Sequence, residues 1–228
     1  MKTSVVVITG ASSGIGAQMA QTFSRKGYSL LLLARNLEAM EAFRLPNARA
    51  YSLDVTDSSA FKEIISKTER EFGQVSCLIN SAGALIAGEF AETHPNEEAA
   101  MVNVNLMGVM NGIHAVLPGM KERKQGTIIN ISSLSDRNSR PLYAAYAASK
   151  AAVKSLTESL RAGYAKSGIR ICNLAPGPVN TAMQSITKVE GKPTISPEDL
   201  ANTALWMFEQ PNHVCIRDLV IAPTTYEP

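Results

Sequence analysis

A tyrosine and a lysine stand four residues apart in the second half of the chain, Tyr146 and Lys150, and Ser133 precedes Tyr146 by 13 residues. On a helix this spacing puts both side chains on one face, so the ammonium lies near the phenol. A free tyrosine titrates near pH ~10, too high for proton exchange at neutrality. A nearby positive charge favours phenolate and lowers that pKa. With a serine hydroxyl to bind the reacting oxygen, the pattern predicts acid–base chemistry at an alcohol or carbonyl group.

The tyrosine–lysine pair alone is a weak signal, because such pairs are common on ordinary helices. Tyr143 has no lysine at the same spacing, since the residue four positions on is Ala147. The interpretation therefore depends on a second motif near the N-terminus.

That second motif is a glycine-rich loop, Thr9-Gly10-Ala11-Ser12-Ser13-Gly14-Ile15-Gly16, which follows an apolar segment and precedes an amphipathic helical pattern. A pyrophosphate needs a turn without side chains, so that backbone N–H groups and the positive helix end approach its oxygens. Gly10 suits the turn, Gly14 admits the phosphate, and Gly16 lets helix and strand pack closely. A tight turn without a ligand is the alternative, but the position between first strand and first helix favours a nucleotide.

The end of the second apolar segment indicates which nucleotide. NAD sites usually carry a carboxylate there that holds the ribose 2′-OH. This chain instead has Leu33-Ala34-Arg35-Asn36, and Arg35 is placed to pair with a 2′-phosphate, with Ser12 adding a hydroxyl contact. In the alternative, Arg35 is a solvated surface residue and Glu38 reaches the ribose. We expect NADP(H) in preference to NAD(H).

The third apolar segment is followed by Asp54-Val55. A carboxylate and a backbone amide at this place are suited to the edge of the adenine ring. Asp54 could instead cap the next helix, although Asp57 looks the better cap.

Short apolar segments alternate with longer helical patterns along the chain, and continuous apolar strands are typical of parallel sheets covered on both faces. The predicted strands are Ser4–Thr9, Ser29–Ala34, Arg49–Leu53, Ser76–Asn80, Gly126–Ile131, Ile169–Leu174 and Asp218–Ala222. This alternation predicts an α/β fold with a doubly wound parallel sheet and helices on both faces. We expect one domain over residues 1–228, with a substrate loop at about 182–196 and a final helix that opens at Ser196.

Two helical patterns are more apolar than an outer helix needs. The segment from about Glu97 to Leu117 is apolar almost all round, and the segment from Ala144 to Tyr164 is rich in alanine. A second apolar face indicates a partner chain, although deep burial is the alternative. We expect a homodimer or a homotetramer.

The bulk composition excludes several functional classes. Hydrophobic residues make up 45% of the chain and charged residues 18%, and the net charge of +2 is too balanced to indicate nucleic acid or a membrane surface. The three cysteines are widely spaced and suit reduced core thiols, and the three histidines share no ligand spacing, so we expect no metal site. No signal-like or membrane-length apolar run is evident, and we expect a cytoplasmic protein.

Taken together, these motifs resemble the short-chain dehydrogenase/reductase family over nearly the whole chain. The matching residues are Thr9 to Gly16, Asp54-Val55, Asn80-Ser81-Ala82-Gly83, Asn105, Ser133, Tyr146 with Lys150, and Pro176-Gly177-Pro178-Val179-Asn180-Thr181. The family commonly has a second asparagine where this chain has Ser81, a change that we expect to be tolerated. The C-terminal part is similar to NADP-dependent 3-hydroxy acid (serine-type) dehydrogenases.

The resemblance implies a Rossmann-type sheet in the order 3-2-1-4-5-6-7. It also implies a catalytic tetrad, which consists of Asn105, Ser133, Tyr146 and Lys150. Lys150 would also hold the nicotinamide ribose, and Asn105 would bend its helix and hold a water. Val179 and Thr181 would contact the nicotinamide carboxamide. The other cofactor contacts expected are Asn80, Ala82, Gly83, Pro176 and Gly177.

The expected function is hydride exchange between NADP(H) and a small polar alcohol or carbonyl compound. The polar segment 134–142 and the stretch after Thr181 are expected to frame the pocket, and the absence of a bulky apolar lid favours a small substrate. Arg137 and Arg140 would suit a carboxylate, although a solvated loop explains them equally well. The alternatives are a non-catalytic NADP(H)-binding regulator and, less well supported, an epimerase or dehydratase.

Overall fold

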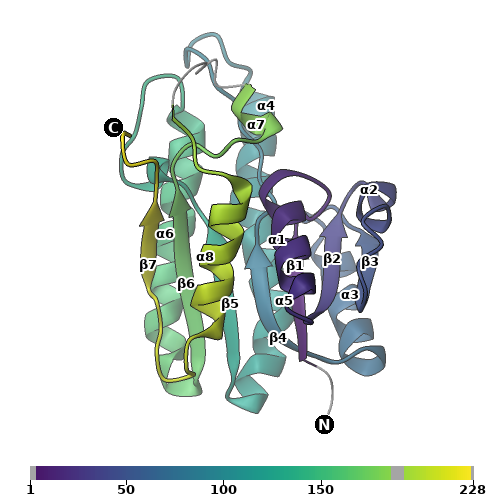
Figure 1. The fold of residues 1–228 in the computed structure, drawn as a ribbon. Helices are drawn as coiled ribbons and strands as arrows, with labels where there is room; N and C mark the ends of the chain where they lie inside the picture. Colours follow the sequence, from purple (N-terminus) through teal and green to yellow (C-terminus); the bar gives the residue numbers. More distant parts are fainter. Residues whose placement is uncertain (1–3, 186–192, 227–228) are drawn as a thin grey trace.

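Seven parallel strands form one sheet in the order β3-β2-β1-β4-β5-β6-β7 in the computed structural model of the chain, which describes residues 4–185 and 193–226 (Figure 1). The strands are Ser4–Thr9 (β1), Ser29–Ala34 (β2), Ala48–Ser52 (β3), Gln74–Asn80 (β4), Gly126–Ile131 (β5), Ile169–Pro176 (β6) and Asp218–Ile221 (β7). Every neighbouring pair in this order is parallel. The predicted doubly wound sheet is confirmed.

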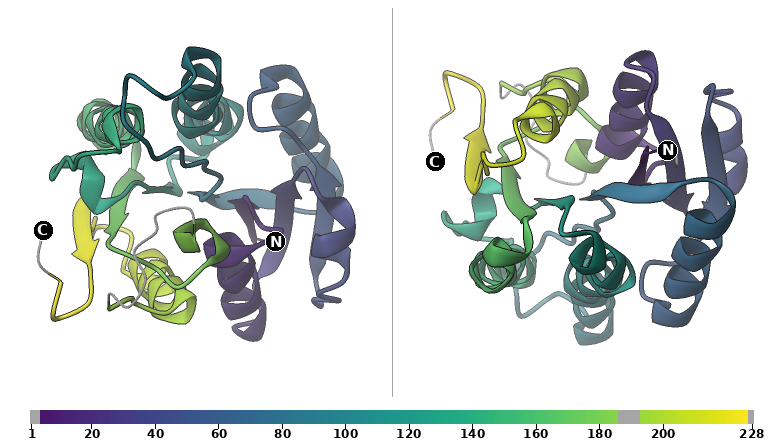
Figure 2. Two further views of the ribbon diagram at one scale, coloured as in Figure 1. Left: turned by 90° about the horizontal axis from the view of Figure 1, so that it is seen from above. Right: turned by 90° about the horizontal axis from the view of Figure 1, so that it is seen from below.

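Helices cover both faces of the sheet, with α1 and α8 on one face and α3, α5 and α6 on the other (Figure 2). The helices are Gly14–Arg25 (α1), Leu37–Glu41 (α2), Ser58–Glu71 (α3), Pro95–Val102 (α4), Gly108–Arg123 (α5), Ala144–Tyr164 (α6), Ala182–Ser185 (α7) and Pro197–Glu209 (α8). Three short segments are Asn103–Met107 (η1, π-helical), Leu134–Asp136 (η2) and Ala165–Ser167 (η3), the last two being 3₁₀ turns. Of the expected substrate loop at about 182–196, residues 186–192 lie outside the described residues.

The central strands of the sheet are buried on both faces because their side chains alternate between two cores. In β1, Val6 and Ile8 join the core beneath α1 and α8, whereas Val5 and Val7 join the core beneath α3, α5 and α6. All four side chains are fully buried. Successive side chains of a strand point to opposite faces, so a continuous apolar run is required here.

Four strand bounds differ from the prediction by one or two residues, namely those of β3, β4, β6 and β7. β4 begins at Gln74 because Gln74 and Val75 pair with the start of β1. β6 continues to Pro176, which pairs with Ile221 of β7. Hydropathy carries no information on pairing of this kind, which explains the differences.

The predicted helix from about Glu97 to Leu117 is longer than expected and irregular. It runs from Pro95 to Arg123 as α4, η1 and α5, and its middle turn, Asn103–Met107, is π-helical. By length and composition alone this run matches a membrane-spanning helix. In the fold, however, α5 packs against α3, β4 and β5, and this packing accounts for much of its apolar character.

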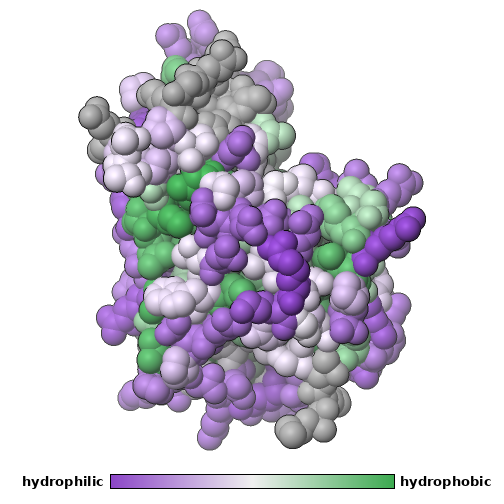
Figure 3. All heavy atoms as spheres, viewed as in Figure 1, coloured by the Kyte–Doolittle hydropathy of each residue, from purple (hydrophilic) through white to green (hydrophobic). Residues whose placement is uncertain are grey.

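The face over α1 and α8 is mostly hydrophilic, with a hydrophobic patch along β7 at the sheet edge (Figure 3). Val220 of β7 is 44% exposed. The three cysteines are free thiols, with Cys77 and Cys172 buried and Cys215 half-buried. The Sγ atoms of Cys172 and Cys215 are 4.0 Å apart.

Candidate active site

The glycine-rich loop joins β1 to α1, and Thr9, the last residue of β1, ties the start of the loop to the segment after β4. The Thr9 Oγ1 atom accepts hydrogen bonds of 3.1 Å from the backbone N–H groups of Ser81 and Ala82, which follow β4. Gly10 has a φ of +67°, and a Cβ there would lie 2.8 Å from the Ala82 Cα. Only glycine fits this turn, because both the backbone conformation and the space exclude a side chain.

The two following glycines shape the start of α1. Gly14 has a φ of +52°, and a Cβ on Gly16 would collide with the Gly10 carbonyl oxygen. α1 begins directly after this turn, with Ser13 at its N-cap position. The loop thus presents backbone rather than side chains at a helix N-terminus, a geometry that fits a pyrophosphate.

A groove of about 700 Å³ runs over this loop and the ends of β2 and β3. The predicted cofactor residues that line it are Gly10, Ser12, Ser13, Gly14, Ile15, Gly16, Arg35, Asp54, Val55, Ala82, Gly83 and Thr181. A nucleotide laid along the groove would therefore meet the glycine loop and the turns after β2 and β3.

At the β2 end of the groove, Arg35 and Asn36 form part of the lining, and Arg35 is exposed. Glu38, the alternative ribose ligand, lies outside the described lining of the groove. A guanidinium at this position is suited to a phosphate on the ribose.

Asp54 lines the groove after β3 and also holds its own turn. Its Oδ1 accepts hydrogen bonds from the backbone N–H and the hydroxyl of Thr56 at 2.9 and 2.7 Å, and these bonds lower the pKa of the Asp54 carboxyl. Asp57 caps α3 by accepting from the Ala60 N–H at 2.9 Å, as predicted. The cap of α3 is therefore Asp57 and not Asp54.

A second cavity of about 180 Å³ adjoins the groove at the carboxyl ends of β4, β5 and β6. The predicted residues that line it are Ile15, Gly83, Ser133, Tyr146, Lys150, Pro176, Gly177, Val179 and Thr181. Ile15, Gly83 and Thr181 line both hollows, so the two are continuous. The fold brings the distant serine, tyrosine and lysine to one place beside the glycine loop.

Ser133 and Lys150 are both hydrogen-bonded to the backbone at the end of β5 or just after it. The Ser133 Oγ accepts from the Ser135 N–H at 3.1 Å, and the Ser133 hydroxyl also forms a hydrogen bond with Tyr146. The buried Lys150 Nζ donates to the Ile131 carbonyl oxygen at 3.0 Å and lies 5.8 Å from the centre of the Tyr146 ring. The side chains thus have fixed directions before any ligand is bound.

Burial dominates the protonation of this pair. It raises the pKa of Tyr146 above its usual value, while a hydrogen bond with Ser133 lowers it and the charge of Asp136 raises it further. Burial also lowers the pKa of Lys150 to about 8. In the protein without cofactor the Lys150 ammonium is directed at the Ile131 carbonyl. The lowering of the Tyr146 pKa by Lys150 together with the positive charge of oxidised nicotinamide therefore stays a prediction.

Asn105 sits in the π-helical turn behind the cavity and is fully buried. Its Oδ1 accepts from the Ala84 N–H at 2.8 Å, and its Nδ2 donates to the Ala84 carbonyl and to the Ser149 Oγ, both at 3.0 Å. A Cβ on Gly83 would lie 3.3 Å from the Asn105 Oδ1 and 3.6 Å from the Lys150 Nζ. Asn105 therefore fixes the segment after β4 against α6.

Only one of the two candidate substrate arginines, Arg140, is among the described residues that line the cavity. Arg140 lines the cavity, and its guanidinium lies 4.8 Å from the centre of the Tyr226 ring. Arg137 points elsewhere and pairs with Asp136 and Asp218. Tyr143 also lines the cavity, although it has no lysine partner.

One predicted cofactor residue lies away from both hollows, and several supporting residues were not found from the sequence. Asn80, expected at the cofactor, is buried and donates to the Asn130 Oδ1 at 2.8 Å, outside the described linings of the groove and the cavity. Its cofactor role stays a prediction. Three further residues that the sequence did not identify support the site through hydrogen bonds. Ser149 accepts from Asn105. Asn173 donates to Asp136 and to Asp218. A polar residue within an apolar strand, as in Ile-Cys-Asn173-Leu, is the signal that could have found Asn173.

Comparison with known proteins agrees with this arrangement. The sequence profile of the short chain dehydrogenase family matches residues 4–190. An uncharacterised oxidoreductase of Staphylococcus saprophyticus is 34% identical over 230 residues, which is 98% of each chain.

Two solved structures are similar over almost their full length, and both contain a nucleotide. An alcohol dehydrogenase from the archaeon Thermococcus sibiricus, complexed with 5-hydroxy-NADP, has a TM-score of 0.90 at 27% identity and covers 100% of this chain and 99% of its own. A closed form of serine dehydrogenase complexed with NADP⁺ has a TM-score of 0.93 at 27% identity, with 98% and 96% covered. The chain is an oxidoreductase that belongs to the short-chain dehydrogenase family.

Proposed function

We propose that the chain transfers a hydride between NADP(H) and a small polar alcohol or carbonyl compound, acting on a CH–OH group in the oxidising direction. The observation that carries this proposal is the common cavity of Ser133, Tyr146 and Lys150, which opens into the groove over the glycine loop. Its volume of about 180 Å³ suits a small substrate.

Tyr146 is the proton donor and acceptor. In the reducing direction its hydroxyl protonates the substrate oxygen, and in the oxidising direction the phenolate takes the proton back. Ser133 donates a hydrogen bond to the same oxygen and stabilises its developing charge. The Ser133 hydroxyl is already oriented by the Ser135 N–H and by its hydrogen bond with Tyr146, so a substrate oxygen bound between Ser133 and Tyr146 would meet both hydroxyls.

Lys150 has two roles in this scheme. One of its three hydrogens binds the Ile131 carbonyl, which leaves two for the ribose hydroxyls of the nucleotide and for the phenol oxygen. When bound, the nucleotide supplies or accepts the hydride, and its oxidised ring adds a positive charge that favours phenolate. Asn105 fixes the segment after β4 through its bonds to the Ala84 backbone. As the family resemblance implies, Asn105 would also hold a water that links Lys150 to solvent.

The preference for NADP(H) over NAD(H) rests on Arg35. Its side chain is exposed at the groove, and no described acidic residue shares the turn after β2 within the groove lining. The serine and alcohol dehydrogenases of similar fold were solved with NADP⁺ and 5-hydroxy-NADP. A 2′-phosphate is the ligand that this guanidinium is placed to bind.

Steady-state oxidation of NADPH with a panel of small ketones, aldehydes and 3-oxo acids tests the proposal, together with NADP⁺ reduction by the matching alcohols and 3-hydroxy acids. We expect turnover with at least one small polar member and a lower rate with NADH. Tight NADPH binding without turnover for any member would contradict the proposal and favour a regulator that only binds the nucleotide.

A further inference from the structure

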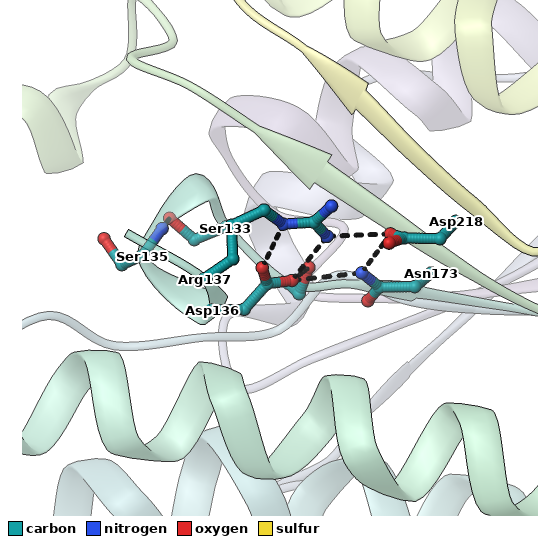
Figure 4. Close-up of polar contacts among 7 residues, drawn as sticks. Ser133, Ser135, Asp136, Arg137, Asn173 and Asp218 are labelled. Atoms are coloured by element: carbon teal, nitrogen blue, oxygen red, sulfur yellow. Dashed lines mark hydrogen bonds and ion pairs between the residues drawn. The ribbon is translucent and has the colours of Figure 1, made fainter. Parts of the chain in front are cut away.

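A fully buried carboxylate, that of Asp136, lies in the short turn that follows the candidate catalytic serine (Figure 4). It accepts hydrogen bonds from the Ser132 hydroxyl at 2.6 Å, from the Arg137 Nε at 2.6 Å and from the Asn173 Nδ2 at 3.0 Å. Burying a charge of this kind is costly unless it is paired and hydrogen-bonded. All three partners therefore matter to the local structure.

The same cluster ties the turn after β5 to the edge of the sheet. Arg137 donates through Nη2 to the Asp218 Oδ1 at 2.8 Å, and Asn173 donates through Nδ2 to the same oxygen at 2.9 Å. Asn173 belongs to β6 and Asp218 to β7. Figure 4 shows the two carboxylates on either side of the Arg137 guanidinium.

Ser133 lies between two fixed points of this cluster. Ser132 is held through its hydroxyl by Asp136, and the Asp136 N–H donates to the Ser133 carbonyl at 2.9 Å. Asp136 itself lies outside the described lining of the catalytic cavity, so it would touch neither substrate nor nucleotide. Its influence must act through its neighbours.

We propose that Asp136 is a positioning residue: its carboxylate fixes the Ser132–Ser133 turn and sets the pH range of the reaction by placing a negative charge behind Tyr146 and Lys150. The inference rests on the proposed function, because it assigns Asp136 to the same site. It adds a residue that neither the motifs nor the linings of the nucleotide groove and the catalytic cavity identify.

Several charged groups surround this carboxylate from three elements. Arg137 faces it from its own turn, Asp218 and Arg217 from the β7 side, and Lys150, Lys154 and Glu158 from α6. Burial has the largest effect on the catalytic pair, since it raises the pKa of Tyr146 and lowers the pKa of Lys150. The charge of Asp136 raises both pKa values.

The test is Asp136→Asn, with Asp218→Asn as the matched control in the same cluster. We expect Asp136→Asn to lower kcat by about 10- to 100-fold, the size of effect expected from misplacing a reacting group, with the KM for NADP⁺ nearly unchanged. Without the negative charge Tyr146 ionises at lower pH, so the rise of kcat/KM in the oxidising direction should move to lower pH. Asp218→Asn should leave that rise in place.

A second measurement separates this inference from the proposed function. The phenolate absorbance of Tyr146, taken as the difference between each protein and its Tyr146→Phe counterpart, should titrate at lower pH in Asp136→Asn than in the parent. This readout needs no turnover, so an inactive parent would overturn the function alone. If Asp136→Asn does not fold, Asp136→Ser, which leaves room for a water, takes its place. An unchanged Tyr146 titration and pH profile, or equal shifts in Asp218→Asn, would overturn the role of Asp136.

Discussion

At the scale of single residues, burial sets the chemistry of the candidate site. Lys150 is only 6% exposed, and its ammonium has a backbone carbonyl, that of Ile131, as its hydrogen-bond acceptor. Burial disfavours the charged form of a lysine and the charged form of a tyrosine alike. The two groups are therefore both shifted toward their neutral forms before the nucleotide binds.

The lowered pKa of Lys150 makes a prediction about stability. With a pKa of about 8 in the folded protein against the usual 10.5, the folded state disfavours the ammonium by roughly 3 kcal/mol. This cost is fully present below pH 8 and is relieved as the pH rises toward 10.5, because the unfolded chain then binds more protons. Lys150→Met should therefore be more stable than the parent near pH 7, with the gap closing by pH 10.5, as measured by urea unfolding. A constant gap across this range would contradict the lowered pKa.

A second prediction at this scale concerns Arg35. If its guanidinium pairs with the 2′-phosphate, Arg35→Ala should weaken NADPH binding by roughly 10- to 100-fold, the equivalent of charge-assisted hydrogen bonds worth about 1.5–3 kcal/mol. Binding of NADH, which has no 2′-phosphate, serves as the internal control and should change little. Titration calorimetry with both nucleotides distinguishes the cases. An equal loss of affinity for NADPH and NADH would mean that Arg35 does not bind the 2′-phosphate.

The sequence predicted those site residues whose chemistry repeats at a recognisable spacing. Ser133, Tyr146 and Lys150 do line one cavity, as the spacing indicated. Asp136 was identified only as part of a polar loop, because its partners Asn173 and Asp218 come from strands far along the chain. Long-range hydrogen bonds leave no periodic signal in the sequence.

At the scale of elements, the turn between β1 and α1 has the strictest requirement. Gly16→Ala would place a methyl group against the Gly10 carbonyl oxygen, which belongs to the backbone and cannot move aside without opening the loop. We expect a loss of about 1–3 kcal/mol in unfolding free energy, as for other overpacked sites, and a marked loss of NADPH affinity.

The matched control is Gly163→Ala in α6, where an added Cβ has no described neighbour within 4 Å. Alanine in a helix is more stable than glycine by about 0.5–1 kcal/mol, so this variant should gain stability and bind NADPH normally. Thermal unfolding and nucleotide titration of both variants check the pair. Normal binding by Gly16→Ala would show that the loop does not require close packing.

Element positions were predictable wherever a buried face imposed a period. The extent of α6, Ala144–Tyr164, and the Ser196 cap of α8 agree with the prediction, the latter as a full capping box with Asp199. The π-helical turn at Asn103–Met107 was not predicted as such, although a local bend at Asn105 was expected. Its cause is tertiary, since the Asn105 side chain binds the Ala84 backbone rather than its own helix.

At the scale of the whole molecule, the order of the strands explains where the site lies. β1 is flanked by β2 on one side and β4 on the other. The connection after β1 therefore runs toward the β2 side of the sheet, whereas the connection after β4 runs toward the β5 side. Ligands of open α/β sheets bind at the carboxyl ends of the strands at such a switch point. The groove and the cavity both lie there, with α4 and α7 above them (Figure 1).

The expected homodimer or homotetramer is also a property of the whole molecule. α6 keeps Ala148 and Ala151 exposed, and Met107 at the end of η1 is 41% exposed, so both helices still present apolar surface. Light scattering coupled to gel filtration should give two or four times the monomer mass. Ala151→Glu should lower the mass, whereas Lys62→Glu on exposed α3 should not. A monomeric parent would contradict the prediction.

The most direct test of the account compares Tyr146→Phe with Tyr143→Phe, because each variant removes one hydroxyl from the same cavity. With the best substrate of the panel, Tyr146→Phe should lose about 10²- to 10⁴-fold in kcat, the usual contribution of a general acid, while its NADPH affinity stays nearly intact. Tyr143→Phe, which lacks a lysine four residues on, should keep turnover within about tenfold of the parent. Undiminished turnover in Tyr146→Phe, or an equal loss in both variants, would contradict the assignment of Tyr146 as the proton donor and acceptor.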